Sequence, residues 1–214
     1  QVHSILADLG VSSHQIDSPE RGFSTRFSGP RDMRMNKGGK VTAATILNSY
    51  SEEQLHKIFG MYGELKNART AARAVVNSRS QRKLETTHDL KEALQEVAPR
   101  GRENKYFAQV FQALRIEVNE EMQALEDFLH QTGDVILGGG RLVVMSYHSL
   151  EDRMVKNYLA TGKVYGDQDK DFYGNVVRPF DPVNRKPIEA STAEVEENPR
   201  ARSAKLRIGE RRSS

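Results

Sequence analysis

The stretch Arg141-Leu-Val-Val-Met-Ser-Tyr-His-Ser-Leu-Glu-Asp-Arg153 decides the fold, because it passes from an apolar run to a helix through polar residues. The unbroken apolar run from Leu142 to Met145 is typical of a strand that is covered on both faces. Ser149 is expected to cap the following helix, with Asp152 in its first turn. The residues between strand and helix therefore lie at the carboxyl end of a strand, where α/β sheets bind ligands.

Tyr147 and His148 occupy this turn, and their chemistry allows a binding site. The Tyr147 ring can stack on a base, and His148 can bind phosphate or carry a proton. The helix that starts at Ser149 attracts anions to its amino end. An ordinary capping turn, in which Asp152 and Arg153 form a solvated pair, explains the same residues without a site.

A second buried strand is predicted over residues 2–9, and it also ends in polar side chains. Asp8 can accept hydrogen bonds from an ammonium, hydroxyl or amine group of a ligand, while Ser12, Ser13 and Gln15 can orient that ligand. The alternative is an Asx-type turn, in which Asp8 only satisfies loop amides. Two polar strand ends in one sheet favour a ligand site over two unrelated turns.

Between these strands the pattern is helical from residue 41 to 131. Ser51 and Gln54 fit a capping box, Thr87 is expected to cap a later helix, and the longest helix is predicted over 104–131. Two short strands are predicted near 176–180 and 204–210. This order of elements predicts an α/β fold, in which a sheet is interrupted by an inserted all-helical subdomain.

Residues 17–40 form a long polar connector with little periodicity. Connectors of this length inside a compact domain are usually functional or disordered. The apolar side chains of Phe23, Phe27, Met33 and Met35 argue against disorder, because they need packing partners. We therefore expect the connector to pack on the rest of the chain.

The charges are nearly balanced but unevenly placed. The 32 Lys and Arg residues against 29 Asp and Glu residues give a formal net charge of +3, which is too small to indicate a polyanionic partner. Lys66, Arg69 and Arg73 fall on one predicted helical face, and Arg200 and Arg202 follow in the tail. Runs of charged residues usually form a solvent-exposed surface with no binding role. Two clusters of positive charge nevertheless favour contact with a polyanion.

Composition excludes several classes of site. The sequence has no cysteine, so disulfides, thiolate zinc sites and cysteine nucleophiles are excluded. The six histidines lack paired spacing with carboxylates, so we expect no metal site. No Gly-x-Ser-x-Gly motif supports a serine hydrolase. No apolar run approaches the roughly 18 residues that span a bilayer, and we expect a soluble, cytoplasmic protein without a membrane partner.

Three separated segments carry a more specific signal. They are LADLGVSSHQIDSPERGFS (residues 6–24) with GPRDMRM (29–35), GGRLVVMSYHSLEDRMVK (139–156) and NPRARSAKLR (198–207). Together with FQALRIEVNEE (111–121), they resemble the bacterial 16S ribosomal RNA cytosine-N4 methyltransferase family of the MraW type. The resemblance covers essentially the whole chain.

The resemblance implies a class I S-adenosylmethionine-dependent methyltransferase with a Rossmann-like sheet. Residues 1–40 and 105–214 would form a partial methyltransferase domain, and residues 41–104 an inserted helical substrate-recognition subdomain. It implies that Asp8 and Gln15 contact the cofactor S-adenosyl-L-methionine. The family's glycine-rich cofactor loop and ribose-binding acid have no counterpart here, so we expect a sheet that is truncated at its N-terminal side.

The implied reaction moves a methyl group to the exocyclic N4 amine of a cytidine in the decoding region of 16S ribosomal RNA. The expected partner is therefore 16S ribosomal RNA or the small ribosomal subunit; whether the protein forms a homodimer stays open. The residues assigned to catalysis are Asp8, Ser12, Ser13 and His148. Tyr147 and His148 are assigned to the target base. The residues assigned to RNA phosphates are Lys66, Arg69, Arg73, Arg200 and Arg202.

Two alternatives to this reading remain. One is a truncated, non-catalytic RNA-binding module, in which the basic clusters act without a cofactor. The other is a methyltransferase for a small molecule or a protein, which would keep the role of Asp8 but not the phosphate contacts.

Overall fold

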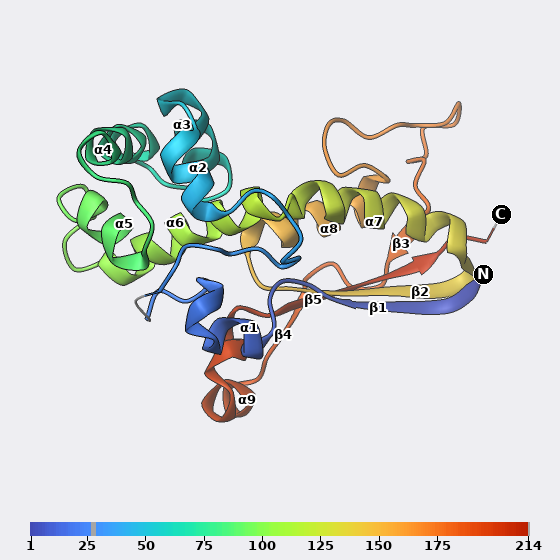
Figure 1. The fold of residues 1–214 in the computed structure, drawn as a ribbon. Helices are drawn as coiled ribbons and strands as arrows, with labels where there is room; N and C mark the ends of the chain where they lie inside the picture. The colour runs from blue at the N-terminus through green and yellow to red at the C-terminus, as the bar shows by residue number, and fades with distance from the viewer. Residues whose placement is uncertain (27–28, 214) are drawn as a thin grey trace. The chain divides into compact units, whose positions relative to one another are not determined.

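The structure is a computed structural model that describes residues 1–26 and 29–213. It divides into two compact units, which we describe separately (Figure 1). The sheet unit comprises Gln1–Gly10 and Met122–Ser214, and the helical unit comprises Val11–Glu121. The helical unit extends on both sides beyond the predicted insert 41–104, whose role in substrate recognition stays a prediction.

The sheet unit is built on a mixed sheet with strand order β1-β2-β5-β3. Its strands are β1 (Val2–Asp8), β2 (Ile136–Ser146), β3 (Phe180–Pro182), β4 (Ile188–Glu189) and β5 (Lys205–Arg211). Strands β1 and β2 run parallel, with Leu6 opposite Val143, whereas β5 runs antiparallel to β2, β3 and β4. The α/β class is confirmed, with antiparallel pairing on one side of a parallel pair.

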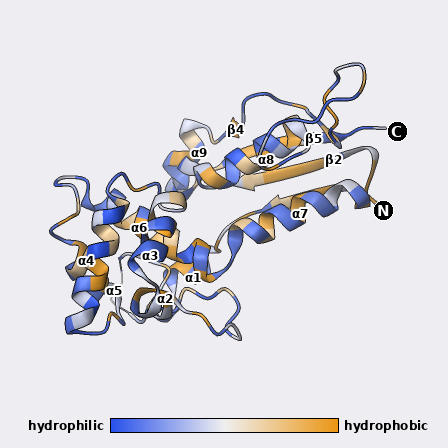
Figure 2. Cartoon of the chain, turned by 90° about the horizontal axis from the view of Figure 1, so that it is seen from above, coloured by the Kyte–Doolittle hydropathy of each residue, from blue (hydrophilic) through white to orange (hydrophobic). Residues whose placement is uncertain are grey.

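Two long helices lie along one face of this sheet, as Figure 1 shows. They are α7 (Glu121–Val135) and α8 (Ser149–Thr161); the short α9 (Thr192–Glu197) and η2 (Pro199–Ser203) precede β5. Tyr158 and Leu159 of α8 are buried, and the Tyr158 ring contacts that of Phe180 with centroids 6.1 Å apart. A Cβ at Gly209 of β5 would clash with Leu159, so the glycine allows this close packing. In Figure 2, β2 is drawn largely in the colour of hydrophobic residues.

The helical unit packs its helices around one apolar core. Its elements are α1 (Ser13–Asp17), η1 (Pro19–Arg21), α2 (Ala43–Ser49), α3 (Glu52–Met61), α4 (Ala68–Gln81), α5 (Thr87–Leu94) and α6 (Glu103–Val118). Ser51 and Gln54 form the predicted capping box at the start of α3. Leu55, Phe59 and Leu114 are among the core side chains with no exposed surface. Burial of such side chains stabilises the unit by about 1.5–3 kcal/mol each.

The connector between η1 and α2 packs on the helices, as the sequence predicts. Met33 is fully buried in the helical core. Nδ2 of Asn119 donates to the backbone carbonyl oxygen of Met33 at 2.8 Å. The guanidinium of Arg31 is buried over the ring of Phe111, at 3.7 Å from its centroid. A cation stacked on a ring away from water contributes about 2 kcal/mol. Phe27 lies outside the described residues.

Three boundary predictions are wrong. The helix expected over 104–131 is two helices, because Glu120 adopts a left-handed φ of 48° between α6 and α7. The strand expected at 176–180 begins only at Phe180; Val176 forms an isolated bridge with Lys170. Thr86, not Thr87, caps α5, with its hydroxyl 3.2 Å from the amide of Asp89.

Within the two described ranges, every helix is too short or too polar to cross a membrane.

Candidate functional site

The carboxyl ends of β1 and β2 bring together two of the predicted site residues. The hydroxyl of Tyr147, directly after β2, donates to Oδ1 of Asp8, the last residue of β1, at 2.7 Å. The parallel pairing produces this contact, since it places Asp8 opposite Met145 and continues with a bond from the Leu9 amide to the Met145 carbonyl. The pair is exposed on the Asp8 side and therefore accessible to a ligand.

The chemistry of this pair is that of an oriented acceptor. Burial, followed by the hydrogen bond to Asp8, raises the pKa of Tyr147 to about 12, so the phenol stays protonated and keeps donating at neutral pH. Oδ2 of Asp8 makes no hydrogen bond within the described residues. A carboxylate held at one oxygen presents the other to an amine, hydroxyl or ammonium group.

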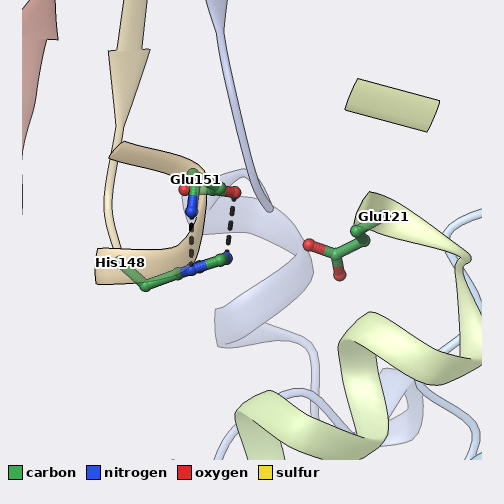
Figure 3. A group of neighbouring side chains, drawn as sticks. All are labelled: Glu121, His148 and Glu151. Atoms are coloured by element: carbon green, nitrogen blue, oxygen red, sulfur yellow. Dashed lines mark hydrogen bonds and ion pairs between the residues drawn. The ribbon is translucent and has the colours of Figure 1, made fainter. Parts of the chain in front are cut away.

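His148 caps helix α8, a role the sequence analysis gave to Ser149. The Nδ1 atom of His148 accepts from the Glu151 amide at 3.3 Å, and its Nε2 lies 3.2 Å from Oε1 of Glu151 (Figure 3). The other carboxylate oxygen of Glu151 accepts from the Tyr147 amide at 2.9 Å. The prediction of Ser149 as the cap is wrong, because the imidazole supplies the acceptor instead. Glu151 thus fixes both turn residues that the sequence put forward.

Asp152 does not form a solvated pair with Arg153, as the alternative reading of the turn assumed. Its two carboxylate oxygens accept from Nε and Nη2 of Arg207 at 2.7 and 3.1 Å. The two side chains are only 12% and 8% exposed. Such a bidentate pair away from water fixes α8 to β5 and so holds the turn that carries Tyr147.

Ser12, Ser13 and Gln15 lie at the start of the helical unit, where they form helix α1. The Ser12 hydroxyl caps α1 by accepting from the backbone amide of Gln15 at 3.2 Å, and Oε1 of the Gln15 side chain accepts from the backbone amide of Ser12 at 2.9 Å. Ser13 is the first residue of this helix. The Gln15 side-chain nitrogen makes no hydrogen bond within the described residues, so it keeps its donors for another group.

The predicted phosphate-binding residues are exposed in both units. Arg69 and Arg73 lie one turn apart on α4, whereas Lys66 precedes this helix and does not share its face as predicted. Arg73 contacts Glu52 at 3.5 Å, with its side chain 62% exposed. Arg200 and Arg202 lie on η2 of the sheet unit and are exposed.

Residues 1–212 match the model of the MraW methylase family. The chain belongs to the MraW methylase family. A ribosomal RNA small subunit methyltransferase H from Cytophaga hutchinsonii is 56% identical over 99% of this chain and 70% of that protein. Proteins of the same name from Phocaeicola vulgatus and Bacteroides thetaiotaomicron are each 55% identical over 99% of this chain, and over 69% and 70% of their own lengths.

Two residues that hold the site of this MraW family member were missed by the sequence analysis. Glu151 ties the turn together, and its place in the first turn of a capped helix is the signal that could have indicated it. Arg207 ends the segment 198–207 that carries the family resemblance, but its pairing with Asp152 was not predicted. No local pattern distinguishes this arginine from its exposed neighbours, because its partner lies far away in the sequence.

Proposed function

We propose that this chain carries the methyl-transfer centre of a small-subunit ribosomal RNA methyltransferase. The cofactor would be S-adenosylmethionine and the methyl acceptor the exocyclic N4 amine of a cytidine in 16S ribosomal RNA. Membership of the MraW methylase family and the names of its relatives support this function. The single structural observation that carries it is the Asp8 carboxylate, held by Tyr147 at the carboxyl edge of the parallel strands.

The reaction needs an aligned amine and an acceptor for one proton. S-adenosylmethionine, when bound, would supply a methyl group on a sulfonium, with the neutral thioether as the leaving group and the amine as the acceptor that loses one proton. The free Oδ2 of Asp8 accepts a hydrogen bond from the N4 amine, orients its lone pair and receives the proton released. Tyr147 holds the carboxylate in one orientation, and such positioning supplies much of the rate enhancement.

One side chain of the helical unit has a free donor that suits the cofactor. The free side-chain nitrogen of Gln15 can donate to a carboxylate or hydroxyl of the cofactor, while its oxygen stays in the capping box of α1. Ser12, Ser13, His148 and the basic residues keep the roles predicted from the sequence. A Rossmann-like class I sheet and a substrate-recognition role for residues 41–104 belong to the same proposal.

The test measures transfer of a labelled methyl group from S-adenosylmethionine to small ribosomal subunits that lack the modification. Asp8→Asn keeps the size and the bond from Tyr147 but removes the proton acceptor, so the rate should fall by about 10²–10⁴-fold. Glu196→Gln, which neutralises an exposed acid on α9 of the same unit, is the matched control and should leave the rate unchanged. Equal rates for Asp8→Asn and the control would overturn the role of Asp8.

A second candidate, an RNA-binding module without catalysis, is favoured by one observation. Asp8 and Gln15 each already have a partner within the chain, as purely structural residues would. Calorimetric titration with S-adenosylmethionine discriminates between the two candidates. RNA binding by the chain with no detectable heat from the cofactor would support the module.

A further inference from the structure

A hollow on the helical unit is not used by the proposed reaction. It has a volume of about 270 Å³ and lies beside α3, with one wall from the end of α6. Pockets for drug-sized ligands begin near roughly 300 Å³, so this one suits a smaller group, such as a single nucleobase. The residues that give it its chemistry are Tyr50, Gln54, Lys57, Met61, Tyr62 and Glu117.

The hollow contains an acceptor that is held in place. The Tyr50 hydroxyl donates to Oε1 of Glu117 at 2.7 Å, whereas the other oxygen of Glu117 makes no hydrogen bond within the described residues. Burial, then this hydrogen bond, raises the pKa of Tyr50 to about 12, so the phenol remains a donor at neutral pH. Glu117 therefore presents its second side-chain oxygen as an acceptor to a ligand that can donate, such as an exocyclic amine.

Donors and a cation complete the polar set. The side-chain oxygen Oε1 of Gln54 accepts from the Ser51 backbone amide at 2.8 Å. The side-chain NH₂ group of Gln54 has no partner within the described ranges. Lys57 is exposed and forms no ion pair with a described acid. An unpaired ammonium at the rim of a pocket fits a phosphate, which it binds as a point charge.

The remaining walls offer surfaces on which a flat ring can pack. Met61 is 52% exposed, and Tyr62 is half-buried next to it. Thioether groups and aromatic rings both make favourable contacts with aromatic systems. Base stacking on aromatic side chains is worth about 1–3 kcal/mol per base and tolerates every base, because each has a π face.

We propose that this hollow binds one unpaired base of RNA that carries an exocyclic amine. The amine donates to the free oxygen of Glu117, Met61 and Tyr62 contact the base, and Lys57 binds the adjoining phosphate. The proposal rests on the proposed function, since it makes RNA the ligand. It adds a second point of contact, on α3 and α6, that recognises the exocyclic amine of the base.

The test is equilibrium binding of labelled five-nucleotide RNAs to this chain, measured by fluorescence anisotropy. The RNAs are UUAUU and UUPUU, in which P is purine riboside, which lacks the exocyclic amine of adenosine and adds no other donor. The wild-type chain should bind UUAUU about tenfold more tightly, because the hydrogen bond from the amine to a charged group is lost with purine riboside. Glu117→Gln places an NH₂ donor where the free oxygen lay, so the preference for adenosine should be lost.

Two further variants separate the contacts. Lys57→Ala should weaken both RNAs equally, because it removes a phosphate contact and not a base contact. Glu53→Gln neutralises an exposed acid on the same helix outside the hollow, and it should keep the tenfold preference. Thermal unfolding of each variant checks that the helical unit stays folded.

Equal binding of the two RNAs by the wild-type chain, or an unchanged preference in a folded Glu117→Gln variant, would overturn the proposal. Its failure is distinguishable from that of the proposed function. If base preference is absent while methyl transfer still depends on Asp8, the hollow is not a base site and the enzyme proposal stands. If the preference is present without methyl transfer, the base site stands alone.

Discussion

The buried ion pair between Asp152 and Arg207 gives a sharp prediction about stability. Arg207→Met removes both hydrogen bonds to Asp152 and leaves a carboxylate that is only 12% exposed. Breaking a buried pair on one side costs about 3–5 kcal/mol. Lys205, whose Nζ lies 4.0 Å from Asp152, partly compensates for the lost charge, so we expect about 3 kcal/mol.

The loss should be visible as a lower melting temperature. For chains of about 150–250 residues, 1 kcal/mol corresponds to roughly 2–4 °C, so Arg207→Met should melt about 6–12 °C lower in far-ultraviolet circular dichroism. The exposed pair Arg141–Glu210, on the same sheet at 3.5 Å, is the matched control. Arg141→Met should cost less than about 1 kcal/mol, as exposed pairs do.

The double variant Asp152→Leu/Arg207→Met completes the cycle. Replacing both charges by apolar groups should restore much of the loss, because no buried charge is left without a partner. The reasoning is refuted if Arg207→Met melts within 2 °C of Arg141→Met, since the pair would then contribute no more than a surface contact.

Two other predictions concern single residues. Tyr147→Phe should remove one tyrosine that ionises only near pH 12 from the absorbance titration of tyrosinate, and leave the part near pH 10 unchanged. Because the folded pKa is raised, the hydrogen-bonded phenol stabilises the fold fully below about pH 10 and loses this effect towards pH 12; equal loss at pH 10 would contradict the assignment. Gly22→Ala should destabilise the helical unit by several kcal/mol, because Gly22 has a φ of 72° and a Cβ there would lie 2.5 Å from the Pro30 carbonyl. Thermal unfolding measures it, and an unchanged melting temperature would show that the connector can shift.

The meeting of Asp8 with Tyr147 could be predicted from the sequence, because both follow apolar runs that end in polar residues. Parallel pairing places carboxyl ends at one edge, and the hydrogen bond between the two side chains agrees with this expectation. The capping box of Ser51 and Gln54 was predictable for a similar reason: it depends on residues three apart and on nothing else.

The misses have two physical causes, one local and one tertiary. Ser149 is a better cap than histidine by residue type, yet His148 accepts from the amide of Glu151 and occupies the position. Nothing in the sequence around Glu120 breaks a helix, since the chain there has neither glycine nor proline. The hydrogen bonds of Asn119 with Met33 and Met35, far away in the sequence, accompany the left-handed turn.

The parallel pairing of β1 with β2 also sets the order in which the chain can fold during synthesis. Leu6 pairs with Val143, so at about 5–20 residues per second the two are made on the order of ten seconds apart. The core of the helical unit lies within residues 33–114, and it can form while β1 still waits for a partner. During that interval the edge of β1 that will pair with β2 has no partner, and unpaired strand edges favour aggregation. Pairing of β1 with β2 is therefore a late step of folding during synthesis, which becomes possible only after the helical core has been made.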